Sequence, residues 1–202
     1  MTKIKLCGLS SPDDIETANT LSPDYIGFVF FEKSRRYVSP SKARELKKLL
    51  NSDIKAVGVF VNESVKAVAE LLGEGVIDIA QLHGDEDESY IGELRKLTDK
   101  PIIKAFRIKS AEDILLCEES SADYVLLDSG AGTGTVFDWS IVKSIKRPYF
   151  LAGGLNINNV SEAVRSLAPF AVDVSSGIET DGRKDKSKMT AFVNAVRKEE
   201  KI

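Results

Sequence analysis

Short apolar segments alternate with longer amphipathic segments along the whole chain. Eight apolar segments of four to six residues begin about 21 to 30 residues apart and are rich in β-branched and aromatic residues. They are too short for helices, and their nearly continuous apolarity is typical of parallel strands covered on both faces. The predicted strands are Ile4–Cys7, Tyr25–Phe30, Lys55–Phe60, Ile77–Leu82, Pro101–Ala105, Tyr124–Asp128, Tyr149–Ala152 and Ala171–Val174.

The segments between these strands carry helical patterns. Within residues 41–50, for example, Ala43, Leu46 and Leu49 recur at three- and four-residue spacing and so share one face of a helix. Helix starts are marked by a capping residue that is followed by proline or by acidic residues. Such starts lie at Ser10 or Ser11, at Ser39 and at Asn159, and the acidic run 85–88 favours another.

Eight strand–helix alternations fit either a closed (β/α)8 barrel or an open, doubly wound sheet. The even spacing favours the barrel, and no GxGxxG motif follows the first strand as a dinucleotide-binding sheet would require. We therefore expect an α/β protein with the (β/α)8 TIM-barrel fold, as a single domain over residues 1–202. At this length the connecting loops must be short.

Composition narrows the classes of function. The chain has 202 residues, a net charge of −3 and 43% apolar residues, which is typical of a globular protein and not of a disordered one. No run reaches the roughly 18 apolar residues of a membrane helix, and the first residues do not resemble a signal peptide. Basic residues are mostly dispersed among acidic ones, so nucleic acid is not the expected partner. With only Cys7 and Cys117, and no CxxC spacing, we expect a reduced, cytoplasmic protein without a metal site.

Two residues at predicted strand ends could carry acid–base chemistry, because barrel active sites form at the carboxyl ends of the strands. Cys7 ends the first strand before Gly8, and its thiol is either a base or nucleophile, or a small core residue. Asp128 ends the apolar sixth strand, where burial would raise its pKa and suit a general acid. A helix cap or a structural salt bridge is the alternative for Asp128. Cys117 lies in a helical pattern and is expected to be a core residue.

Glycine-rich loops after strands seven and eight suggest a phosphate site. The loops that follow these two strands often bind phosphate through backbone N–H groups in such barrels. Simple turn geometry is the alternative at each glycine. Residues 130–134 add a further glycine-rich loop, which is a weak signal by itself. The candidate phosphate-binding residues are Gly153, Gly154, Ser176 and Gly177.

Two further residues follow predicted strands. Arg36 lies in the loop after the second strand, where its guanidinium could bind a planar carboxylate or be a solvated surface charge. His83, the only histidine, ends the fourth strand, where an orienting role is as consistent as a catalytic one.

Taken together, these segments resemble the phosphoribosylanthranilate isomerase family of tryptophan biosynthesis. The resemblance implies that Cys7 is the general base, that Asp128 is the general acid and that Arg36 binds the anthranilate carboxylate. It implies a phosphorylated small-molecule substrate held at the glycine loops, no cofactor, and positions near the substrate for His83 and Asp173 without a specific role. The matching segments are 5–9, 26–30, 33–38, 57–62, 81–85, 104–107, 132–134, 137–139, 151–155 and 172–177.

The chain departs from the family pattern at residues 131–135, where Thr135 stands in place of an expected lysine. We expect this difference to affect loop closure or the charge near the substrate, and not the acid or the base. Two rival functions stay open: another phosphosugar isomerase, such as the aminoaldose isomerase of histidine biosynthesis, and a barrel that only binds phosphate. The histidine-pathway enzyme would be expected to use two aspartates, whereas here the first strand ends in cysteine. We expect a monomer, with a homodimer as the alternative.

Overall fold

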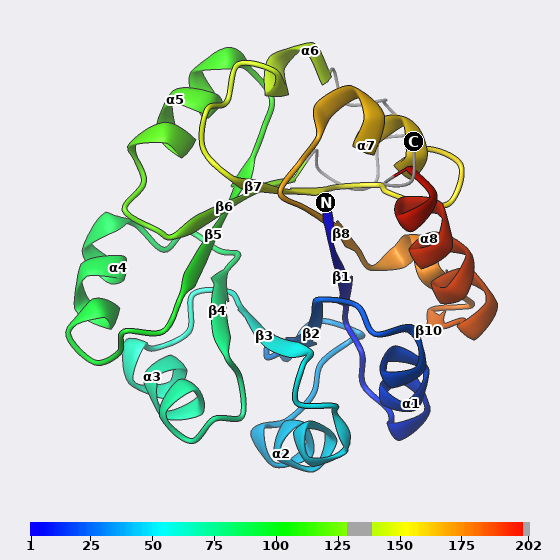
Figure 1. Cartoon of the computed structure of the whole chain (residues 1–202). Coiled ribbons are helices and arrows are strands. Elements are labelled where there is room, and N and C mark those ends of the chain that lie inside the picture. Colours follow the sequence, from blue (N-terminus) through cyan, green and yellow to red (C-terminus); the bar gives the residue numbers. More distant parts are fainter. Residues whose placement is uncertain (129–138, 200–202) are drawn as a thin grey trace.

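A computed structural model of the chain describes residues 1–128 and 139–199. Eight parallel strands are hydrogen-bonded in sequence order, and β1 pairs with β8 to close the barrel (Figure 1). The expected (β/α)8 barrel is therefore confirmed. The strands are β1 (Lys3–Cys7), β2 (Tyr25–Val29), β3 (Lys55–Phe60), β4 (Ile79–Leu82), β5 (Ile102–Arg107), β6 (Tyr124–Asp128), β7 (Tyr149–Ala152) and β8 (Ala171–Val174).

Helices surround the barrel on its outside (Figure 1). Ser11 and Ser39 cap α1 and α2 through their hydroxyl groups, as the sequence predicts, and Asp87 caps α4. Asn159 precedes α7 but makes no side-chain capping bond. The helices are α1 (Pro12–Leu21), α2 (Pro40–Leu49), α3 (Val65–Gly73), α4 (Glu88–Arg95), α5 (Ala111–Glu119), α6 (Trp139–Val142), α7 (Val160–Leu167) and α8 (Lys186–Glu199).

Four of the eight predicted strands match the structure at both ends, and the other four differ by one or two residues at one or both ends. The fourth strand begins at Ile79 instead of Ile77, because the backbone N–H of Ile77 still bonds to the end of α3. The fifth strand extends to Arg107, whose partner in the register with β6 is Asp128. Two polar side chains thus end neighbouring strands at the same edge of the barrel.

Strand alternation divides the apolar residues into two layers. On β1, Ile4 and Leu6 belong to the large core between the strands and the helices. The intervening Lys5 and Cys7 share the other face, and Cys7 clusters with Val29 of β2 and Val59 of β3 inside the barrel. Residues at odd positions of β1 therefore line the interior.

The connection from β8 to α8 carries additional elements. A short 3₁₀ helix, η1 (Ser176–Ile178), is followed by a two-stranded hairpin of β9 (Glu179–Thr180) and β10 (Arg183–Lys184). Asp181, in the turn, has a φ of 51° and Gly182 has a φ of 78°, as a tight hairpin turn requires. This hairpin brings charged residues beside the carboxyl end of the barrel.

Within the described residues, no helix is long and apolar enough to cross a membrane.

Candidate active site

The candidate acid and base lie at the same end of the barrel, as their positions at strand ends require. Cys7 is the last residue of β1 and Asp128 is the last residue of β6, on the far side of the closed sheet (Figure 1). The Cys7 side chain is buried, and Asp128 is partly exposed. The site therefore presents a thiol and a carboxylate across the carboxyl end of the barrel.

A buried ion pair lies directly beneath Cys7 in the barrel. Lys5, on the same inward face of β1, is fully buried, and its Nζ lies 3.0 Å from Oδ1 of Asp173 on β8. Burial acts to lower the pKa of Lys5, but the charge and hydrogen bond of Asp173, with a contribution from Cys7, outweigh it and raise the pKa. Lys5 is therefore held as an ammonium ion.

This ammonium ion acts on the Cys7 thiol. Burial raises the pKa of Cys7, since it disfavours the thiolate, and Asp173 raises it further. Lys5 opposes both through its charge and a side-chain hydrogen bond, and Lys184 adds positive charge nearby. The net direction is upward, so the thiol is protonated in the free protein at neutral pH. Of the groups around Cys7, Lys5 acts most strongly to lower the pKa of the thiol.

Asp128 belongs to a polar row that begins on β4. Gln81 Nε2 lies 2.8 Å from His83 Nδ1, and His83 Nε2 lies 3.4 Å from Asp128 Oδ2. If the Gln81 amide donates, His83 accepts at Nδ1 and carries its proton on Nε2, toward Asp128. A cavity of about 580 Å³ opens beside this row and includes Arg107 and Lys104 in its lining. His83 and the candidate acid thus lie together at the edge of a ligand-sized space.

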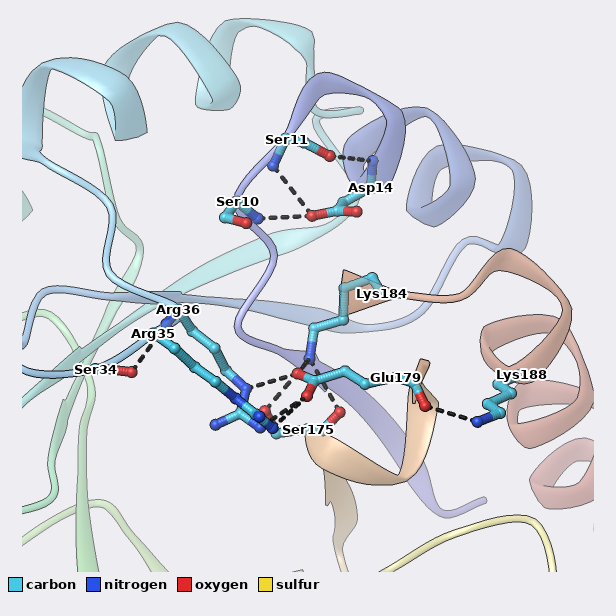
Figure 2. Close-up of polar contacts among 10 residues, drawn as sticks. All are labelled: Ser10, Ser11, Asp14, Ser34, Arg35, Arg36, Ser175, Glu179, Lys184 and Lys188. Carbon is cyan, nitrogen blue, oxygen red and sulfur yellow. Dashed lines mark hydrogen bonds and ion pairs between the residues drawn. The ribbon is translucent and has the colours of Figure 1, made fainter. Parts of the chain in front are cut away.

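Arg36 lies in the loop between β2 and α2, where a buried carboxylate holds its guanidinium (Figure 2). Its Nε and Nη2 atoms lie 2.6 and 2.9 Å from the two oxygens of Glu179 on β9. The Arg36 side chain also lies over Gly8, where an added Cβ would be 2.5 Å from Arg36 Cδ. The bare Gly8 backbone therefore lets the Arg36 side chain pass close to the residue after Cys7, while Glu179 raises the pKa of Arg36 through its hydrogen bond.

Glu179 receives two further cations. Arg35 Nη2 lies 2.8 Å from one oxygen, and Lys184 Nζ lies 2.7 Å from the other (Figure 2). Burial acts to raise the pKa of Glu179, but the hydrogen bonds and charges of Arg36 and Lys184 lower it to about 2. Glu179 is therefore a carboxylate at any physiological pH.

The candidate phosphate loops lie against each other. Gly153 and Gly154 follow β7 with φ angles of 87° and 68°, a conformation that favours glycine. Gly177 follows β8, and an added Cβ there would lie 2.0 Å from the backbone oxygen of Leu155. Gly177 and Ser176 form η1 with Ile178. The structure thus brings the two predicted loops together, with glycine required at their contact.

The predicted site residues fall into two groups in the structure. Cys7, Arg36 and the glycine loops surround one side of the barrel opening, whereas Asp128 and His83 lie on the other. Asp173 lies deeper, as the partner of Lys5. The glycine-rich loop 130–134 and Thr135 lie outside the described residues. Cys117 is buried in α5, as expected of a core residue.

Sequence reasoning missed Lys5, Glu179, Lys184 and Gln81. Lys5 carried a signal, since it shares the alternation phase of Cys7 in an otherwise apolar strand. Glu179 carried none, because its Arg36 partner is 143 residues away. Among residues 1–128 and 139–199, no group of three or more His, Cys, Asp or Glu could hold a metal ion.

Comparison with known proteins places the chain in one family over nearly its whole length. The family model described as N-(5'phosphoribosyl)anthranilate (PRA) isomerase matches residues 4–195. A relative named N-(5'-phosphoribosyl)anthranilate isomerase from Thermoanaerobacter sp. (strain X514) is 45% identical, with 98% of each chain covered.

Solved structures give the same result. The crystal structure of phosphoribosyl anthranilate isomerase from Thermotoga maritima has a TM-score of 0.90 and 32% identity, covering 98% of this chain and 100% of that one. A phosphoribosyl anthranilate isomerase in complex with reduced 1-(o-carboxyphenylamino)-1-deoxyribulose 5-phosphate has a TM-score of 0.87, with the same identity and coverage. The family model and the 45% identical relative each span nearly the whole chain. The chain belongs to the N-(5'-phosphoribosyl)anthranilate isomerase family.

Proposed function

We propose that the protein converts N-(5-phosphoribosyl)anthranilate to 1-(2-carboxyphenylamino)-1-deoxyribulose 5-phosphate in tryptophan biosynthesis. The observation that carries the proposal is the family match over residues 4–195, together with a cysteine and an aspartate at opposed strand ends of the barrel. A relative holds a reduced form of this product in its structure.

The reaction needs one acid and one base. Protonation of the furanose ring oxygen opens the ring to a protonated Schiff base, and loss of the C2 proton then gives an enolamine. Tautomerisation of the enolamine gives the aminoketose, so carbon 1 is reduced while carbon 2 is oxidised within one molecule. No external electron carrier enters this balance. Two positioned side chains can therefore supply the whole of the acid–base chemistry.

In this proposal Asp128 gives its proton to the ring oxygen, and Cys7 removes the C2 proton. The buried Cys7 thiol is a strong base once ionised, because burial raises its pKa. Lys5 stabilises the thiolate that must form before the C2 proton leaves. His83 orients the Asp128 carboxyl group through Nε2.

Two anchors would hold the substrate between these groups. The phosphate would bind at Gly153, Gly154, Ser176 and Gly177, while the carboxylate would bind the free N–H groups of Arg36. Asp173 acts on the site through Lys5. Fixing both ends of the substrate places the sugar carbons at the acid and the base, which supplies much of the rate enhancement.

The test is turnover of freshly generated N-(5-phosphoribosyl)anthranilate, with the product identified by mass and NMR. We expect wild-type turnover, and losses of about 10³-fold in kcat for Cys7→Ser and for Asp128→Asn, with product affinity retained. Cys117→Ser is the matched control, because its thiol is buried in α5 away from the barrel opening, and it should keep full activity.

Wild-type rates in both Cys7→Ser and Asp128→Asn would refute the acid–base assignment. A folded wild-type protein that binds phosphate but turns over no substrate would instead favour another phosphosugar substrate or a binding-only barrel.

A further inference from the structure

Glu179 connects the two substrate anchors of the proposed site, and its position is outside the barrel strands. It lies on β9, in the hairpin between β8 and α8, with its side chain only 4% exposed (Figure 2). Its carboxylate contacts Arg36 of the β2–α2 loop on one side and Lys184 of β10 on the other. It therefore joins loops from the beginning and the end of the chain.

The contact with Arg36 uses only part of the guanidinium. Arginine has five N–H donors, and Glu179 takes the one on Nε and one on Nη2. The donors on Nη1 and the second on Nη2 form another edge that a planar carboxylate can bind in the same bidentate way. Since Glu179 holds the guanidinium and the aliphatic part of the Arg36 side chain lies close over Gly8, this second edge has a fixed direction.

The contact with Lys184 continues to the candidate phosphate loop. Lys184 Nζ lies 2.7 Å from Glu179 Oε1 and 3.0 Å from the backbone oxygen of Ser175, the residue before Ser176 and Gly177. Lys188 of α8 also donates to the backbone oxygen of Glu179, at 2.7 Å. A continuous polar chain thus runs from Arg36 through Glu179 and Lys184 to the loop after β8.

The charge of this cluster fits a ligand more than a structural ion pair. Arg36 and Lys184, whose side chains are 22% and 3% exposed, bring two positive charges to one carboxylate, which leaves a charge of +1 (2 − 1) beside the barrel opening, and the solvent-exposed Arg35 adds a third cation at its rim. A pair that served only stability would be balanced, because an uncompensated buried charge is costly. A substrate with a carboxylate and a phosphate supplies the missing negative charge.

We infer that Glu179 is a positioning residue that couples the carboxylate-binding Arg36 to the phosphate-binding loop after β8. This inference rests on the proposed function, because it assigns the two anchors to one substrate. Through Glu179 and Lys184, binding at either anchor sets the position of the other.

The experiment measures this coupling by fragment binding, without turnover. Calorimetry gives the affinity of anthranilate alone and in saturating ribose 5-phosphate, and the ratio of the two is the coupling. In the wild type we expect ribose 5-phosphate to strengthen anthranilate binding about tenfold. Glu179→Gln should reduce this factor to about one and raise KM for the full substrate about tenfold.

Matched variants separate coupling from stability. Lys184→Met leaves the Arg36–Glu179 contact in place, so it should abolish coupling while anthranilate alone binds as in the wild type. This variant also keeps the test valid if Glu179→Gln does not fold. Glu199→Gln removes a comparably buried carboxylate that is bonded to Arg165 at the other end of the barrel, and it should change neither coupling nor KM.

Wild-type coupling in folded Glu179→Gln or in Lys184→Met would overturn the inference. So would a wild-type protein whose two fragments bind independently. Because these measurements need no reaction, an inactive wild type that still couples the fragments would contradict the proposed chemistry and not the role of Glu179.

Discussion

The two ends of the barrel interior are built from the same eight strands but have opposite characters. At the amino ends of the strands, Tyr25, Tyr124, Phe150 and Phe170 form a cluster of rings with centroids 5.0 to 5.8 Å apart. A few residues further along β1 and β8, the interior holds the charged pair Lys5 and Asp173.

One end of the barrel interior therefore mainly stabilises the fold, and the other holds the charged groups beside the candidate site. The aromatic end buries apolar area through ring contacts, and the hydroxyl of Tyr25 accepts a hydrogen bond from Lys3 Nζ at 3.4 Å. The charged end gives up that gain, since buried ions are costly to desolvate and add little net stability. Such a pair can instead act on a neighbouring group, and the next inward-facing residue on β1 is Cys7, whose pKa Lys5 acts to lower.

The largest expected effect is at the aromatic end. Phe150 is completely buried, and Phe150→Ala leaves a cavity among the rings, so we expect the free energy of unfolding to fall by about 4 kcal/mol. Urea unfolding measures the loss. The kcat of the folded fraction should stay near wild type, because Phe150 lies far below Cys7.

Leu97→Ala is the matched control for apolar loss, since Leu97 is 59% exposed, and it should cost less than about 0.5 kcal/mol. A folded Phe150→Ala protein with an unchanged unfolding curve, or with kcat lowered a hundredfold, would remove the division between the two ends.

At the charged end, a single and a double substitution should change the free energy of unfolding by different amounts. Lys5→Met leaves the Asp173 carboxylate buried without its ammonium partner, and we expect a loss of about 3 kcal/mol. Lys5→Met with Asp173→Leu replaces the pair by apolar side chains and should be as stable as the wild type or more so.

The double variant should nevertheless raise the pKa of Cys7, because the lowering effect of Lys5 exceeds the raising effect of Asp173. The rate of Cys7 alkylation by iodoacetamide against pH, in a Cys117→Ser background, measures this directly. A thiol titration identical to that of the parent would show that the buried pair does not act on Cys7.

The smallest expected change in the free energy of unfolding concerns Glu179, a residue of the proposed site whose carboxylate also stabilises the fold. Its pKa is lowered from 4.5 to about 2, so the folded state binds the proton less tightly than the unfolded chain does. The resulting stabilisation is complete above pH 4.5 and is lost as the pH falls toward 2. Its size is about 2 kcal/mol, after allowance for the solvent-exposed Arg35.

Urea unfolding of the wild type and Glu179→Gln between pH 7 and pH 2.5 tests this, and the difference between them should shrink as the solution becomes more acidic. A constant difference would mean that the carboxylate gains nothing from its cations.

The fold could be predicted from the sequence because each strand and several of the helix starts carry a local signal. The apolar runs gave the number and order of the strands, and Ser11 and Ser39 marked helix starts through their own backbone contacts. The boundaries that differ are those decided by neighbours, such as the extension of β5 to Arg107 beside β6.

The site was only partly predictable for a related reason. The positions of Cys7 and Asp128 at the barrel opening could be predicted because both residues end strands, and strand ends in a barrel lie at the opening. Glu179 was not, since an ion pair between residues 143 positions apart leaves no trace in local composition. Lys5 could have been found by counting alternate residues back from Cys7, because an inward-facing lysine in a closed barrel needs a counterion.

The pairing of β1 with β8 imposes an order of events when the chain is synthesised. Lys3 pairs with Ala171, so the first strand waits for nearly the whole polypeptide to leave the ribosome before its second edge is covered. The guanidinium of Arg36 gains its partner later still, because the hairpin that contains Glu179 and Lys184 follows β8 in the chain. A nascent chain that stops after β8 but before this hairpin has all eight strands, its thiol and its aspartate, but no carboxylate to hold Arg36, so on the proposed function the carboxylate anchor is the last part of the site to form.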